Sequence, residues 1–276
     1  MQQQAVECRF ASSDSWVILS PIEQSIKQKI DTIGTPLKDW NINIYRGVLT
    51  GYNDAFIIST EKRNEILANC QTEDERTRTA ELIRPILRGR DIKRYSYDWA
   101  NLWLINTHNG IKGKIPRIQI ENYPAIKAHL DQYWEKISTR ADKGDTPYNL
   151  RNCAYMEDFS KPKIVWGNLN LTPNYALVEN NSFINAPSSM IVPASKYLLA
   201  ILNSKIADFY IKLLGVTRNG GYFEYKPMFI EQLPIPQLKI ENKELAQIER
   251  LIDNNNYTEI EYIVYNLYGL TQDEIN

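Results

Sequence analysis

The chain has 276 residues, of which 43% are hydrophobic, and a formal net charge of −1. This length and composition can supply the core of one large domain, or of one domain with an appendage, while a near-zero charge argues against a protein that holds a polyanion through its overall charge alone. No apolar run approaches the ~20 residues of a membrane-spanning helix, and the N-terminus lacks a signal-peptide pattern, so we expect a cytoplasmic protein with no membrane partner.

The first predicted helix begins with a capping box at residues 20–23 and ends before Gly34. Two strands are expected next, at residues 42–45 and 55–58. The loop between these strands is too loose for a phosphate loop, because it lacks the Gly-Lys-Ser/Thr ending. It nevertheless offers a cation and two hydrogen-bonding side chains, from Arg46, Thr50 and Asn53.

A basic turn follows the second predicted helix, which a capping box opens at residues 72–75 and which Pro85 should end or kink. Between Arg76 and Arg94 the sequence has seven basic and two acidic residues. Clustered arginines suit a solvated surface as well as a phosphate-binding one, so the pattern leaves both interpretations open. The candidate phosphate contacts in this turn are Arg88, Arg90, Lys93 and Arg94.

The middle of the chain alternates regular elements with polar loops. A strand at residues 102–105 leads into the loop 108–117, which is rich in glycine and contains Lys112 and Lys114, and which we expect to be a mobile surface loop. A helix opened by Pro124 should bury one face that includes Trp134, and His129 is expected to lie on this helix. Four short strands follow between residues 163 and 192.

One long apolar helix is predicted from Tyr197 to Leu214, with Gly215 as its stop. The turn after it, Arg218-Asn219-Gly220-Gly221, combines a cation, an amide and two residues that adopt positive φ easily, so it can approach an anion closely. On this pattern alone, a tight connection to a strand at residues 222–225 is the simpler interpretation.

The composition becomes helical and acidic after residue 238. From Lys239 to Asn276 there are three basic and eight acidic residues, so this tail has a charge of −5 and the preceding 238 residues have +4. Two amphipathic stretches on either side of residues 254–256 predict an antiparallel helical hairpin. We therefore predict two domains, residues 1–237 and 238–276, and expect the hairpin to pack on a partner, because two short helices bury little by themselves.

The residue types indicate no catalytic and no metal site. The two histidines, His108 and His129, are not at ligand spacing from a second histidine or a cysteine. The three cysteines, Cys8, Cys70 and Cys153, are far apart in sequence, as expected of reduced thiols.

Two alternatives to a binding module stay open. The first is a divalent-metal nuclease centred on Glu81, Asp91 and Lys93, which follow the acid-x-lysine order of many such enzymes, although the surrounding arginines oppose metal binding. The second is a protein interaction scaffold that uses the acidic helices.

Several blocks of sequence, taken together and in order, are similar to one family. They read GTPLKDWNINIYRGVLTGYNDAFIIS, RPILRGRDIKRYSYDWANLWLI, KPKIVWGN, YLLAILNSKIADFYIK, RNGGYFEYKPMFIEQLPIP and VYNLYGLTQDEI. These blocks, which cover nearly the whole chain, resemble the TaqI-like C-terminal specificity domain. That family is the target-recognition region of adenine-specific DNA methyltransferases and of type IIG restriction-modification enzymes, and is related to type I specificity subunits.

The resemblance implies an α+β fold, with a β-rich target-recognition domain, flanking helices and a C-terminal helical hairpin. It implies double-stranded DNA as one partner and a methyltransferase module or subunit as the other, with S-adenosylmethionine on that missing part and no cofactor here. The chain would be a fragment, a split subunit or a truncated remnant, and it lacks the Asn-Pro-Pro-aromatic tetrapeptide of the catalytic region. We therefore expect that the chain alone neither methylates nor cleaves DNA.

The candidate DNA-contacting residues combine those found above with one from the KPKIVWGN block. One departure from the family pattern puts a phosphate contact in doubt, because the sequence has Leu49 where the family turn would carry a cation. The complete set is Arg46, Thr50, Asn53, Arg88, Arg90, Lys93, Arg94, Lys112, Lys114, Trp166, Arg218, Asn219, Gly220 and Gly221.

Overall fold

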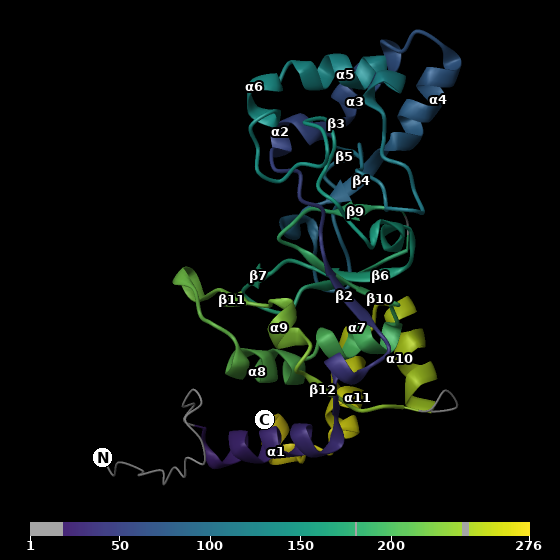
Figure 1. The fold of residues 1–276 in the computed structure, drawn as a ribbon. Coiled ribbons are helices and arrows are strands. Elements are labelled where there is room, and N and C mark those ends of the chain that lie inside the picture. Colours follow the sequence, from purple (N-terminus) through teal and green to yellow (C-terminus); the bar gives the residue numbers. More distant parts are fainter. Residues whose placement is uncertain (1–18, 180, 239–242) are drawn as a thin grey trace. The chain divides into compact units, whose positions relative to one another are not determined.

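The structure, a computed structural model, describes residues 19–179, 181–238 and 243–276 (Figure 1). By its internal contacts the chain divides into two units. Unit 1 comprises Met1–Ile42, Asn170–Pro173 and Ser195–Asn276, and unit 2 comprises Asn43–Leu169 and Asn174–Ala194. Helices and several small sheets together confirm the predicted α+β class.

Unit 2 contains an antiparallel sheet in the order β2-β10-β6-β8. The strands are β2 (Asn43–Arg46), β10 (Ser189–Val192), β6 (Lys163–Trp166) and β8 (Tyr175–Val178). Strands β10 and β6 are buried along their whole length, as expected for the two central strands. The register aligns the residues at one end of the sheet in a single row, which runs Arg46, Ser189, Trp166, Tyr175.

A second sheet in unit 2 has the order β3-β5-β4-β9. It is built from β3 (Ile57–Ser59), β5 (Leu102–Ile105), β4 (Ile83–Leu87) and β9 (Phe183–Ile184), and only the β4–β9 pair is parallel. Pro85 lies inside β4, so the preceding helix ends three residues before it, at Leu82.

Helices cover the second sheet on the side away from β9 in the chain trace (Figure 1). They are α2 (Asn53–Phe56), α3 (Thr60–Ala68), α4 (Glu73–Leu82), α5 (Pro124–Asp131) and α6 (Trp134–Ile137). Unit 2 also has three short 3₁₀ turns, at Gly89–Asp91, Ile120–Asn122 and Met156–Ser160. Side chains cap α3 and α4, where Ser59 accepts from the Lys62 amide and Thr72 accepts from the Glu75 amide.

The helix predicted from Pro124 is interrupted, which corrects the sequence prediction. It stops at Asp131, resumes as α6 at Trp134, and leaves Trp134 45% exposed rather than on the buried face. His129 does lie on α5, buried, and its Nε2 donates to the Ala55 carbonyl at 3.0 Å. This bond joins α5 to α2.

The two histidines should make the stability of unit 2 depend on pH. Burial lowers the pKa of His129 and of His108, so the folded state binds fewer protons than the unfolded state near pH 6. The free energy of unfolding should therefore fall as pH drops below about 6.5, by up to about 1.4 kcal/mol per pH unit for each histidine. Urea unfolding at pH 7.5, 6.5 and 5.5 measures this slope.

A substitution separates the two contributions. His129→Gln keeps an N–H that can reach the Ala55 carbonyl and removes the titration, so the slope should become shallower, and His108→Gln is the matched control for the other ring. An unchanged slope in both variants would contradict the assignment to histidine.

Unit 1 is mainly helical. Its elements include α1 (Pro21–Ile33), α7 (Lys196–Leu202), α8 (Lys205–Leu214), α9 (Pro227–Ile230), α10 (Lys243–Asp253), α11 (Tyr257–Leu267) and α12 (Gln272–Ile275), together with the 3₁₀ turns Leu37–Asp39 and Asn219–Gly221. Its short strands are β1 (Thr35–Pro36), which pairs with β12 (Pro234–Ile235), and β11 (Phe223–Glu224). Strand β7 (Leu169–Asn170) falls where the sequence passes from unit 2 to unit 1. The capping box of α1 is present at Ser20 and Glu23.

The long helix predicted from Tyr197 to Leu214 is two helices. The first helix, α7, ends with Asn203 as its C-cap, and the Ser204 side chain caps the start of α8 by accepting a hydrogen bond from the Ala207 amide. Six of the seven residues of α7 are buried, so its apolar character is not a one-sided stripe.

The helical hairpin is present as α10 and α11, and unit 1 itself covers its apolar face. Ile248 and Val264 are fully buried, and α10 and α11 both pack on α7. Beyond the hairpin, the Tyr268 hydroxyl donates to the Pro234 carbonyl at 2.7 Å. A separate role for residues 238–276 stays a prediction, but burial of their apolar side chains needs no second protein.

Candidate nucleic-acid interface

Arg46 stands at the end of β2, in the row that closes one end of the first sheet. Its side chain is exposed, and no carboxylate in the described ranges pairs with it. The Arg46 carbonyl accepts a hydrogen bond from the Tyr155 hydroxyl at 2.9 Å, and the Tyr155 ring stacks on Tyr45 with centroids 4.1 Å apart. A rigid edge strand therefore presents this cation to solvent.

The basic turn after β4 packs on the same end of the sheet. A Cβ atom at Gly89 would meet Ser188 Oγ at 3.1 Å and Gly167 Cα at 3.3 Å, so glycine permits this close approach. The Tyr95 amide donates to the Tyr175 carbonyl at 2.8 Å. Arg46 and the turn 88–95 thus lie around one end of one sheet, which their sequence separation did not indicate.

Within this turn, Arg88 serves the fold. Its Nε and Nη2 donate to the Asp91 carboxylate at 3.0 and 2.7 Å, and its backbone amide donates to Asp91 Oδ2 at 2.8 Å. This pairing raises the pKa of Arg88, and Asp91 is only 5% exposed. Asp91 therefore engages the guanidinium of Arg88, and contact of Arg88 with a phosphate stays a prediction.

The same geometry gives no support to the nuclease alternative. The Asp91 carboxylate is occupied by Arg88, and Lys93 Nζ donates to the Arg90 carbonyl at 2.9 Å. Across the described residues, no group of three or more His, Cys, Asp and Glu side chains could hold a metal ion.

Three cations of the turn are exposed to solvent. They are Arg90, Lys93 and Arg94, of which Arg94 lies over the ring of Tyr95 at 5.2 Å. Stacking on an aromatic ring restrains a guanidinium.

The loop 108–117 forms a short hairpin rather than a loose excursion. Ile111 and Ile115 pair across it, and both Gly110 and Gly113 have positive φ, of 74° and 76°. Its tip, Lys112-Gly113-Lys114, is exposed, and no atom lies within 4 Å of a Cβ built on Gly113. Lys114 pairs with Glu157, whereas Lys112 has no ion pair within the described part of the chain.

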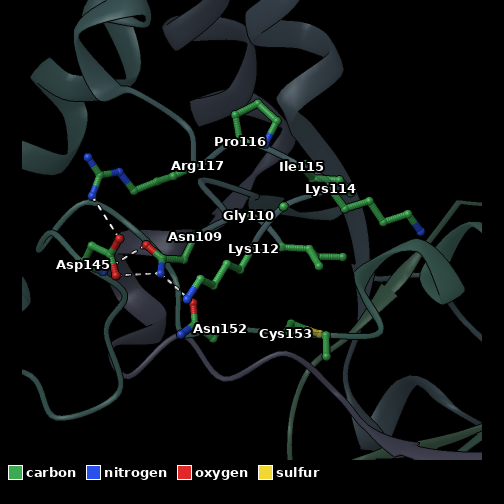
Figure 2. Close-up of a pocket in the computed structure, with 13 residues that line it drawn as sticks. Asn109, Gly110, Lys112, Lys114, Ile115, Pro116, Arg117, Asp145, Asn152 and Cys153 are labelled. Atoms are coloured by element: carbon green, nitrogen blue, oxygen red, sulfur yellow. Dashed lines mark hydrogen bonds and ion pairs between the residues drawn. The ribbon is translucent and has the colours of Figure 1, made fainter.

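Asn109 fixes the base of this hairpin (Figure 2). Its Nδ2 donates to Asp145 Oδ1 at 2.9 Å and to Asn152 Oδ1 at 2.5 Å, and its Oδ1 accepts from the Asp145 amide at 2.9 Å. Arg117 pairs with Asp145 at 3.1 Å. These bonds join the base of the hairpin to residues 145–152, whereas the sequence led us to expect a mobile loop.

A hollow of about 830 Å³ adjoins the hairpin and is lined by residues of the loop and by Asp145, Asn152 and Cys153 (Figure 2). A second, smaller hollow of about 160 Å³ is lined by Arg46 and again by Asn152 and Cys153. The shared lining residues make the two hollows neighbours. Unit 2 thus brings Arg46 and Lys112 to one continuous surface.

Cys153 is a poor nucleophile in this position, because burial raises the pKa of its thiol to about 11. Both Cys70 and Cys153 are free thiols, as expected, whereas Cys8 lies outside the described residues.

Two further candidates are not accessible. Trp166 is 0% exposed and packs against Tyr175, with ring centroids 5.5 Å apart, so it belongs to the core. Thr50 is 2% exposed and donates to Asn53 Oδ1 at 2.6 Å. Asn53, at the start of α2, is exposed.

Sequence reasoning missed Arg140, which organises the loop next to this surface. Its guanidinium is buried and donates to the carbonyls of Ile137, Asp142 and Asn149 at 3.0, 3.1 and 2.6 Å, and also to the Pro147 carbonyl. It lies 4.5 Å from the centroid of the Phe56 ring. No local pattern marks an arginine whose partners are backbone carbonyls.

In unit 1, the turn Arg218–Gly221 is the tip of a small hairpin. The Arg218 amide donates to the Tyr222 carbonyl at 2.6 Å, and Thr217 pairs with Phe223. Gly220 and Gly221 have φ of 75° and 79°, as their sequence suggested, and the whole tip is exposed. The guanidinium of Arg218 pairs with Glu224.

No helix of the described residues is long and apolar enough to cross a membrane. Among curated proteins, the chain is similar to the type II methyltransferase M.XhoI of Xanthomonas vasicola, at 19% identity over 272 residues. That match covers 95% of this chain and 46% of the relative, so the chain spans about half the length of the methyltransferase.

Two solved structures share the fold at low identity. One is the type IIL restriction-modification enzyme MmeI in complex with DNA, with a TM-score of 0.61 and 12% identity over 86% of this chain and 34% of that one. The other is the type IIG restriction endonuclease BpuSI, with a TM-score of 0.55 and 12% identity over 90% of this chain and 33% of that one.

A family model matches residues 84–235, which is more than half of the chain and includes both the basic turn of unit 2 and the glycine tip of unit 1. The resemblance seen in the sequence blocks is thereby confirmed. The chain belongs to the family of the TaqI-like C-terminal specificity domain.

Proposed function

We propose that this chain is the sequence-specific DNA-recognition module of a DNA adenine methyltransferase or type IIG restriction-modification system. Its partners are double-stranded DNA and a methyltransferase module or subunit, which carries S-adenosylmethionine and the catalytic residues and lies outside this chain. Such a system works in the cytoplasm. Family membership and the names of its relatives support this proposal.

The observation that carries the proposal is a set of exposed cations, Arg46, Arg90 and Lys112, for which the described residues of unit 2 supply no carboxylate partner. Arg46 and Arg90 flank one end of the first sheet, and Lys112 caps a hairpin with a fixed base. Some other cations of unit 2, such as Lys62 and Lys127, are instead neutralised by nearby carboxylates. Unpaired cations on rigid elements are what contact with phosphates requires.

The two units contribute differently. Unit 2 supplies phosphate contacts from Arg46, Arg90, Lys93, Arg94 and Lys112, while Lys114 contributes less because Glu157 offsets its charge. Unit 1 supplies base contacts from the tip of Arg218 and Asn219, since arginine commonly reads guanine and asparagine reads adenine.

A salt titration tests the phosphate contacts. Replacing Arg46, Arg90, Lys93 and Lys112 together by glutamine should weaken binding to all duplex sequences alike, because these cations release counterions from the backbone. The plot of log affinity against log salt should become shallower by about 0.9 for each phosphate that the variant no longer neutralises. Fluorescence anisotropy with a labelled duplex at several salt concentrations measures the slope.

The matched control removes the same charge from paired positions of unit 2. Lys62, Lys127 and Lys161 pair with nearby carboxylates at 2.6 to 2.7 Å, and Arg76 lies 3.8 Å from Glu73. Replacing these four by glutamine should change the slope much less. Equal slopes for the two quadruple variants would show that net charge alone binds DNA, and would contradict the proposed interface.

A further inference from the structure

We propose that Glu224 is a positioning residue for base recognition, which holds the guanidinium of Arg218 so that its outer edge reads a guanine. This inference rests on the proposed function and names the residue pair that sets specificity at one base pair. It concerns the hairpin of residues 216–226, which belongs to unit 1.

The carboxylate of Glu224 is enclosed by two cations. Arg218 Nε and Nη2 lie 2.6 and 2.5 Å from Glu224 Oε1, and Lys226 Nζ lies 2.6 Å from Oε2. The side chain of Glu224 is 9% exposed, whereas those of Arg218 and Lys226 are 53% and 43% exposed. Both cations thus stand on the solvent side of the carboxylate.

This arrangement leaves a defined part of Arg218 available. A guanidinium has five N–H donors in one plane, and Glu224 engages one on Nε and one on Nη2. The second N–H of Nη2 and those of Nη1 form the opposite edge. Two parallel donors on that edge match the O6 and N7 acceptors of guanine in the major groove.

The hairpin beneath this pair is fixed to α8. Tyr225 is fully buried and its hydroxyl donates to Asp208 Oδ1 at 2.6 Å, while Lys212 pairs with Asp208 at 2.7 Å. The ring of Phe223 lies under Lys212 at 4.8 Å. A side chain held by a second group on a fixed support loses little conformational freedom on binding.

The tip also permits close approach of a duplex. Beyond the pair, Gly220 and Gly221 carry no side chain, and the nearest atom to a Cβ built on either lies 3.6 Å away, on the ring of Tyr222. Backbone can therefore pass near a groove wall without a steric barrier at these two positions.

Charge alone does not explain why a glutamate stands here. A carboxylate near DNA repels phosphates and so weakens binding, unless this repulsion is offset by a favourable effect such as the positioning of a base-reading side chain. Hydrogen bonds from Lys226 and Arg218 lower the pKa of Glu224, which keeps the carboxylate ionised and the pair intact near neutral pH. A positioning role and a purely repulsive one predict opposite effects when the charge is removed.

The experiment is a selection from a library of randomised DNA duplexes with the 276-residue chain, followed by sequencing of the bound fraction. We expect the wild-type chain to enrich a site containing guanine at one position. Arg218→Ala should reduce the preference for that guanine roughly 5- to 100-fold and leave the other positions unchanged. Glu224→Gln should reduce preference at the same position about 10-fold, while binding to unselected DNA stays equal or becomes tighter.

Three further variants sharpen the comparison. The double variant of Arg218→Ala and Glu224→Gln should be no worse than Arg218→Ala alone, because both changes remove one interaction. Arg218→Lys retains a charge beside Glu224 and lacks the planar fork, so it should lose the same preference without disturbing a buried group. Glu231→Gln removes a carboxylate of the same unit that has no ion pair among described residues, and should change nothing.

Several results would overturn the inference. The first is that Glu224→Gln or Arg218→Lys retains the wild-type preference for guanine. The second is that either variant loses preference evenly at all positions and also has a lower melting temperature. The third is that the wild-type chain binds DNA in a salt-sensitive way but enriches no sequence. A wild-type chain that shows no salt-sensitive binding to DNA would instead remove the proposed function itself.

Discussion

A chain that ends at residue 238 should not fold unit 1. The deletion removes α10, α11 and α12, and it uncovers the apolar residues of α7 against which the hairpin packs. This expectation reverses the one drawn from the sequence, which treated the acidic hairpin as an appendage with little to bury.

The size of the effect follows from burial. Among the described residues, seven apolar side chains that this deletion removes are at most 9% exposed, and burying one such side chain stabilises a fold by roughly 1.5–3 kcal/mol. Their combined contribution matches or exceeds the ~5–15 kcal/mol by which a typical domain is stable. The seven are Ile248, Leu251, Ile260, Ile263, Val264, Tyr265 and Tyr268.

Urea unfolding of the truncated chain, followed by far-ultraviolet circular dichroism, should show the loss of one transition and survival of the other. A single substitution gives a milder version of the test. Tyr268→Ala removes a fully buried ring and its bond to Pro234, and should cost ~3–5 kcal/mol, whereas Tyr262→Ala changes a ring that is 57% exposed. A truncated chain that keeps both transitions would contradict the shared core.

Replacing Arg140 by alanine should destabilise unit 2 by ~3–5 kcal/mol. The substitution leaves the carbonyls of Ile137, Asp142, Pro147 and Asn149 without their donor, and each buried acceptor left unsatisfied costs about 1–3 kcal/mol, less where water enters. Burial lowers the pKa of Arg140 to about 10, because the guanidinium has lost contact with water.

Two controls define this result. Arg140→Lys keeps the charge but offers a single ammonium to carbonyls that face a planar fork, so it should recover only part of the loss. Arg151→Ala removes an exposed arginine paired with Asp142 at 2.8 Å and should cost less than ~1 kcal/mol. The measurement is urea unfolding, together with the rate of proteolysis in the loop 138–149. A loss under ~1 kcal/mol for Arg140→Ala would mean that water replaces the guanidinium fully.

Local patterns predicted much of the fold because their causes are local. The capping box at Ser20 and the side-chain cap at Thr72 lie where α1 and α4 begin, and the glycines of the Arg218 turn have the positive φ that their pattern favours. The break between α7 and α8 escaped notice, since apolar spacing continues across Ser204 even though its side chain starts a new helix.

The candidate site was harder to predict, because exposure depends on contacts between distant segments. Trp166 looks the same in sequence whether a strand is central or at an edge, and only the pairing of β6 with β10 and β8 buries it. The partner of Arg88, Asp91, is only three residues away, a spacing at which two side chains can meet. The sequence did not indicate that Arg46 and Lys112 share one surface. The hollows beside them are connected by Asn152 and Cys153, which are distant from both in sequence.

The pairing of β2 with β10 has a consequence for how such chains diversify. Unit 2 begins at Asn43 and ends at Ala194. Asn43 on β2 is aligned with Val192 on β10, so unit 2 begins and ends on neighbouring strands. A recombination event with two crossovers, one at each of these strands, would replace unit 2 as a single segment, and only the four residues 170–173 of unit 1 would be exchanged with it. The rest of unit 1, with its tip at residues 218–221, would keep its own sequence, so the proposed phosphate contacts and the proposed base contacts could be inherited separately.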